Sequence, residues 1–102
     1  MSKTAEFFNG LNERAQNGEF ASAEGNVFQF IIEGAGTWTI DLKDTNSVSN
    51  EGTDSADCTI ETDSGTFEAM LGDPMVAMNA FMSGTLKADN LTLAMQLQQF
   101  LG

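Results

Sequence analysis

Few side chains in this chain of 102 residues are suited to covalent or acid–base chemistry. The sequence holds no His and no Tyr, and Cys58 is its one cysteine. Cys58 falls on the apolar side of an alternating stretch, which predicts a buried, inert thiol. No base is in evidence for that thiol, and no GxSxG nucleophile elbow occurs. We therefore expect no catalytic residue, no enzyme activity and no disulfide within the chain.

Acidic residues outnumber basic ones, with 15 Asp and Glu against 4 Lys and Arg, which gives a formal charge of −11. Asp57 and Glu61 share one face of a predicted strand, but no calcium-loop spacing occurs, so we expect no metal and no cofactor. Such a charge repels the phosphate backbone, so nucleic acid is not expected as a partner. It also disfavours docking on anionic headgroups, which leaves at most transient membrane contact. The acidity fits either general solubility or a saline habitat.

Methionines recur at helical spacing in the second half of the chain. Met75, Met78 and Met82 fall at i, i+3 and i+7, and Met70 and Met95 lie in the same region of the sequence. The thioether side chain is unbranched and polarizable, so it adapts to ligands of varied shape. A single methionine usually fills space in the core. For this cluster of methionines, contact with an apolar ligand is as strong an interpretation as core filling.

Two predicted helices must position these side chains. The first, over residues 74–82, is apolar almost all the way round, with Asn79 as its one polar interruption. A helix of that kind must be buried on every side. A chain of this length has one thin core. We therefore expect a second subunit, a membrane or an apolar ligand to complete the burial.

The second predicted helix, over residues 91–101, has an apolar arc about twice the usual width of roughly 100°. Half of this arc can pack on a sheet.

The rest of the chain supplies that sheet. An amphipathic helix is predicted over residues 3–17, and a short helix over residues 64–72. Alternating apolar and polar residues predict strands at 27–33, 37–43, 47–50, 56–62 and 85–88. Consecutive antiparallel strands with helices on one face make an α+β fold in a single domain over residues 1–102. No signal peptide and no apolar run of about 20 residues is evident, so we expect a cytoplasmic protein.

Four sequence blocks, in order and at compatible spacing, resemble the sterol carrier protein 2 family. They are GTWTIDLK at 36–43, ADCTI at 56–60, AFMSGTLK at 80–87 and LAMQLQ at 93–98. The resemblance implies a five-stranded, mostly antiparallel sheet covered on one face by helices, with an apolar tunnel between the two. Members of this family bind fatty acids, fatty acyl-CoA, phospholipids or sterols without covalent chemistry.

The resemblance also implies which residues contact the ligand. Carried over by position, the predicted tunnel lining is Phe67, Leu71, Met78, Phe81, Met82, Leu86, Met95 and Leu97. The implied function is a non-enzymatic intracellular lipid carrier. The helix over residues 3–17 carries only Lys3 and Arg14 as cations, so it departs from the basic membrane-binding helix of peroxisomal members.

A different class of function fits the same apolar helices. In this alternative they meet a protein partner, and the chain is a homodimerisation or regulatory module that acts with a lipid-metabolising enzyme. The sequence leaves open whether the protein is a monomer or a homodimer. The mass in solution separates the two classes, because a lipid-loaded monomer indicates a carrier and a lipid-free dimer indicates an interaction module.

Overall fold

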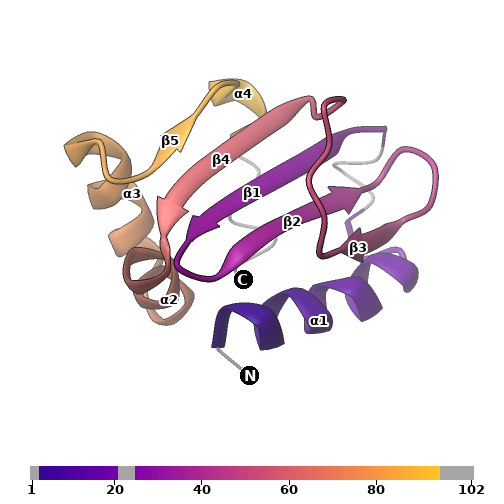
Figure 1. Ribbon diagram of the computed structural model, residues 1–102, viewed down its shortest axis with the longest axis horizontal. Helices are drawn as coiled ribbons and strands as arrows, with labels where there is room; N and C mark the ends of the chain where they lie inside the picture. The colour runs from indigo at the N-terminus through magenta and orange to yellow at the C-terminus, as the bar shows by residue number, and fades with distance from the viewer. Residues whose placement is uncertain (1–2, 21–24, 95–102) are drawn as a thin grey trace.

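The fold is built on a five-stranded sheet with the strand order β3-β2-β1-β4-β5 (Figure 1). The computed structural model describes residues 3–20 and 25–94 of the protein. Three of the four strand pairings are antiparallel, and β1 runs parallel to β4. This confirms the predicted α+β fold with a mostly antiparallel sheet. The strands are β1 (Val27–Glu33), β2 (Gly36–Asp41), β3 (Ser47–Ser49), β4 (Cys58–Asp63) and β5 (Lys87–Ala88).

Three helices agree closely with the sequence prediction. They are α1 (Lys3–Gln16), α2 (Ser64–Gly72) and α3 (Pro74–Ser83). The predicted last helix begins as α4 (Leu91–Ala94), and its remaining residues lie outside the described part of the chain. Figure 1 shows α1 lying along β2 and β3, with α2 and α3 beyond the end where β4 runs into α2.

Phe8 of α1 joins the helices to the sheet. Its ring stacks on Trp38 of β2 with centroids 4.6 Å apart and contacts Phe30 of β1 edge-on at 5.3 Å. It also stacks on Phe67 of α2 at 5.4 Å. All four aromatic side chains are buried. Together they make one aromatic core between α1, α2 and the sheet.

The connection over residues 50–57 crosses the opposite face of the sheet (Figure 1). The Thr53 N–H donates to Gln29 Oε1 at 2.8 Å, and Thr39 Oγ1 donates to the Glu51 carbonyl at 2.6 Å. Gln29 and Thr39 are therefore buried with their side-chain hydrogen bonds satisfied. The same connection carries the chain across to β1, so β4 pairs with it in parallel. The consecutive strands that pair do so antiparallel, as predicted, and the parallel pair joins two strands that are not consecutive in the chain.

Four of the five strands are shorter than the alternation predicted, and at an end of two of them a carboxylate accepts a backbone N–H. The second predicted strand ends at Asp41, whose Oδ1 accepts the N–H of Lys43 at 2.9 Å. The fourth begins at Cys58, and Oδ2 of the preceding Asp57 accepts the N–H of Val27 at 2.8 Å. Backbone hydrogen bonds continue beyond both strand ends, because the Leu42 N–H donates to the Asn26 carbonyl at 3.0 Å and the Asp57 N–H donates to the Val27 carbonyl at 2.8 Å.

Candidate functional site

The candidate site is formed around α2 and α3, which hold most of the predicted ligand contacts. Asp63 caps α2, because its carboxylate accepts the N–H and the hydroxyl of Thr66, both at 2.8 Å. These hydrogen bonds lower the pKa of Asp63, so the carboxylate is charged at neutral pH. The cap directs Phe67 and Met70 into the core, where both are buried, and leaves Leu71 half-buried against it.

A second aspartate starts α3 directly after α2. Asp73 accepts the N–H of Met75 at 2.9 Å, and Pro74 occupies the first turn, where its missing N–H costs nothing. Both features are typical of the start of a helix. They fix the angle between two consecutive helices, so that α3 packs beside α2 and extends the molecule at one end (Figure 1).

The end of α3 explains why the predicted strand over residues 85–88 is shorter. Gly84 closes the helix with a left-handed φ of +86°. The N–H groups of Thr85 and Leu86 then donate to the Ala80 carbonyl at 2.9 and 3.0 Å, so they do not join the sheet. This turn drives Leu86 into the core, with 4% of its surface exposed, before β5 begins at Lys87.

One side of α3 is left without cover. The helix packs through Ala80, which is buried, and through Val76 and Ala77, which are half-buried. We call the opposite side the α3 apolar face; its members and their exposed fractions are Met75 (59%), Met78 (55%), Phe81 (43%) and Met82 (79%). The exposure of these side chains agrees with the expectation that the core of this chain does not enclose the helix: the small residues of α3 face the core and the large ones face away.

The eight predicted lining residues fall into three groups. Phe67 and Leu86 are buried, and Leu71 lies against the same core. Three others belong to the exposed α3 apolar face: Met78, Phe81 and Met82. Met95 and Leu97 lie outside the described residues. The structure thus brings three of the eight residues to the inner side of the helices and places three on the outer side of α3.

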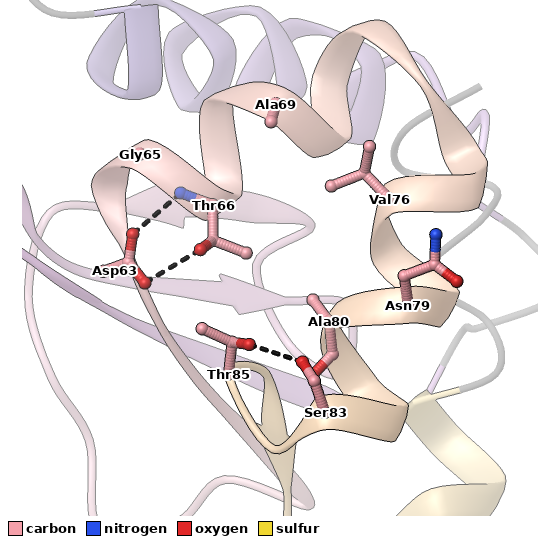
Figure 2. A pocket seen from close by; sticks show the side chains of 9 residues that line it. All are labelled: Asp63, Gly65, Thr66, Ala69, Val76, Asn79, Ala80, Ser83 and Thr85. Atoms are coloured by element: carbon pink, nitrogen blue, oxygen red, sulfur yellow. Dashed lines mark hydrogen bonds between the residues drawn. The ribbon is translucent and has the colours of Figure 1, made fainter.

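A hollow between α2 and the end of α3 was not predicted (Figure 2). It is open to solvent and measures about 600 Å³. Its polar groups bond mainly to one another: Ser83 Oγ lies 2.7 Å from Thr85 Oγ1, and Thr66 is held by Asp63. The hollow is therefore lined by the N-terminal cap of α2 and by the C-terminal end of α3. The sequence signal that could have indicated it is the row of smaller side chains on α3 at i, i+3, i+4 and i+7, namely Val76, Asn79, Ala80 and Ser83.

Cys58 lies fully buried at the start of β4. Burial raises the pKa of its thiol, and Sγ donates to the Asn90 carbonyl at 3.5 Å. The thiol is therefore neutral and shielded, which confirms the prediction of a buried cysteine.

Within residues 3–20 and 25–94, no three His, Cys, Asp or Glu side chains are grouped so as to hold a metal ion. None of the helices in that part of the chain has the length and apolar character needed to span a bilayer.

Residues 7–102 match the profile of the SCP-2 sterol transfer family. The chain belongs to this family. The match confirms the resemblance that the four sequence blocks indicated, and it extends over nearly the whole chain. Among proteins of curated function, none matches this chain by sequence.

Solved structures agree with this assignment at the level of the fold. Sterol carrier protein 2 of Aedes aegypti, solved in complex with palmitate, shares 24% identity and a TM-score of 0.75, covering 100% of this chain and 97% of its own. Palmitated SCP2L2 of the same organism shares 21% identity and a TM-score of 0.75, over 99% and 95% of the two chains. A ubiquinone synthesis protein, UbiJ-SCP2, shares 18% identity and a TM-score of 0.69, over 96% and 91%. At these identities the likeness establishes a common fold.

Proposed function

We propose that this protein is a lipid carrier that binds an acyl chain or a similar apolar molecule in a tunnel between the sheet and the C-terminal helices. The observation that carries the proposal is the family match over residues 7–102. Two proteins of the same fold are described with bound palmitate, which makes a fatty acid the first ligand to test. Fatty acyl-CoA, phospholipids and sterol-like molecules are the other proposed ligands.

The side chains around α2 and α3 support a ligand bound mainly by apolar contact. Removal of apolar surface from water supplies about 25 cal/mol per Å², before the cost of ordering the ligand. Leu71 is half-buried at the margin of the aromatic core, next to the buried Phe67. The polar groups nearby are engaged in capping α2 and ending α3, so few remain to select a headgroup. We therefore expect broad selectivity.

The individual contacts stay predictions. Phe67, Leu71 and Leu86 are proposed as contacts on the inner side, with Met95 and Leu97 from the C-terminal segment. Met78, Phe81 and Met82 are exposed, so a lipid would reach them from the solvent side of α3. The single domain, the cytoplasmic location and the absence of enzyme activity also remain predictions.

Native mass spectrometry of protein purified without detergent tests the proposal. We expect an adduct of a few hundred daltons that is lost on denaturation, and displacement of a fluorescent fatty acid by palmitate. Leu71→Asn should weaken palmitate binding, whereas the matched control Leu71→Met keeps an apolar side chain of similar size and should retain it. A lipid-free protein that binds no palmitate after delipidation would disprove the carrier function.

The alternative is a homodimerisation or regulatory module that acts with a lipid-metabolising enzyme. The exposed α3 apolar face favours this function, because exposed apolar patches commonly mark protein contacts. The fold is also shared with a ubiquinone synthesis protein. A lipid-free dimer in solution would support the alternative, and a lipid-loaded monomer would argue against it.

A further inference from the structure

The α3 apolar face lies in a segment without charge in a strongly charged protein. Residues 74–86 include no acidic or basic side chain, although the chain holds 15 acidic and 4 basic residues. The nearest charges along the sequence are Asp73, which caps the helix, and Lys87, which begins β5. Figure 1 shows α3 at one end of the molecule, next to α2. The four large side chains of the face thus form an uncharged apolar projection.

We infer that the α3 apolar face docks the protein on an uncharged, zwitterionic lipid bilayer. Helices that lie in a membrane interface bury an apolar face at the boundary between headgroups and acyl chains. The face supplies such a surface through flexible Met75, Met78 and Met82 and through Phe81, each at least 43% exposed. The polar side chains of the same helix, Asn79 and Ser83, line the hollow on another side of α3 (Figure 2).

The charge of the protein determines which membrane fits. A net charge of −11 is repelled by anionic headgroups, so attachment to an acidic bilayer opposes the field of the whole molecule. A zwitterionic surface imposes no such cost, and burial of apolar side chains needs no charge partner. The structure therefore favours phosphatidylcholine-like surfaces and predicts weaker attachment as anionic lipid is added.

A second copy of the chain fits the face less well. Side chains of this size present at most roughly 200 Å² each, so four of them, between 43% and 79% exposed, offer far less than the ~800 Å² per partner of a stable protein interface. Two copies would also bring together two charges of −11. A zwitterionic bilayer needs no minimum contact area of this kind, because it adapts to a small patch. It also carries no net charge, so it does not repel the protein.

Docking needs no lipid inside the protein, so it can be tested apart from the proposed carrier function, although Met78 and Met82 are also proposed ligand contacts. The experiment is flotation of the full chain with phosphatidylcholine vesicles. The triple variant Met75→Gln/Met78→Gln/Met82→Gln should fold normally, because all three side chains are more than half exposed. We expect its vesicle partition coefficient to fall by about tenfold or more. The matched triple Met→Leu variant keeps the apolar surface and should partition like the unaltered protein.

Other outcomes would overturn the inference. These are absence of binding to phosphatidylcholine vesicles, equal binding by the glutamine variant, or stronger binding when phosphatidylglycerol replaces part of the lipid. Two further measurements exclude the other occupants of the face. Met75 is exposed and is not a proposed ligand contact, so Met75→Gln alone should weaken vesicle binding and leave palmitate binding in vesicle-free solution unchanged; loss of palmitate binding in this variant would show that the face holds the ligand. If the unaltered protein were a dimer that the triple glutamine variant converted to a monomer, a second copy would cover the face.

Discussion

The indole of Trp38 stacks on the phenyl ring of Phe8, with ring centroids 4.6 Å apart and planes inclined by 9°. Trp38 belongs to β2 and Phe8 to α1, so the contact attaches the N-terminal helix to the sheet. Phe8 also contacts Phe30 and Phe67, which come from β1 and α2. One side chain of α1 therefore holds three other elements of the core together.

Removal of this ring should strongly destabilise the protein. Phe8 is fully buried, so Phe8→Ala loses its apolar burial and leaves a cavity, at a cost of about 3–5 kcal/mol. Chemical denaturation followed by Trp38 fluorescence measures this cost directly. Phe81→Ala is the matched control, because Phe81 is 43% exposed and its removal should cost under about 1 kcal/mol. Equal losses in the two variants would show that Phe8 does not organise the core.

The elements of the fold were predictable from local patterns, but the order of the strands in the sheet was not. Alternation and helical periodicity located the strands and helices, and the structure buries Phe28, Phe30 and Trp38 and begins α3 after the Asp73 cap. The parallel pairing of β1 with β4 depends on the connection over residues 50–57. That connection is polar and nonperiodic, and its hydrogen bonds to the sheet join residues distant in sequence.

The end of α3 should be sensitive to a side chain at Gly84. Its φ of +86° lies in the left-handed region, where a Cβ is crowded, so Gly84→Ala should cost about 1–2 kcal/mol. Gly10→Ala is the opposite case, because Gly10 lies within α1 and a Cβ there meets nothing within 4 Å. That variant should gain up to about 1 kcal/mol. Thermal or chemical denaturation of the two variants checks whether their effects have opposite signs.

The candidate site was only partly predictable. Helical periodicity showed that residues 74–82 hold too many apolar side chains for one core, which was correct. It did not show which side faces inward, because a helix that is apolar all round has no strong orientation signal. In the structure the orientation of α3 follows the size of its side chains. The small Ala80 packs inward, whereas the larger Met78 and Met82 are exposed.

Cys58 should be almost unreactive toward thiol reagents in the folded protein. It is fully buried, and desolvation raises its pKa, so the reactive thiolate is scarce even at pH 8. Modification then requires local or global opening. The control is Ser49→Cys in a Cys58→Ala background, which places a thiol on an exposed strand. We expect Cys58 to react at least about 100-fold more slowly than this control and to react fully in denaturant. Equal rates in buffer would contradict the burial of Cys58.

The cap of α2 should make stability depend on pH through Asp63. Hydrogen bonds from the backbone and side chain of Thr66 lower the pKa of this carboxyl below 3.8 in the folded state. Its stabilising contribution is therefore present above pH 3.8 and is lost as the pH falls through the lowered folded value. Asp63→Asn should lower the melting temperature at pH 7, and its difference from the unaltered protein should shrink near pH 3. Asp54→Asn removes the same charge from an exposed position in the 50–57 connection and serves as the control. A constant difference between pH 7 and pH 3 would show that the charge of Asp63 does not stabilise α2.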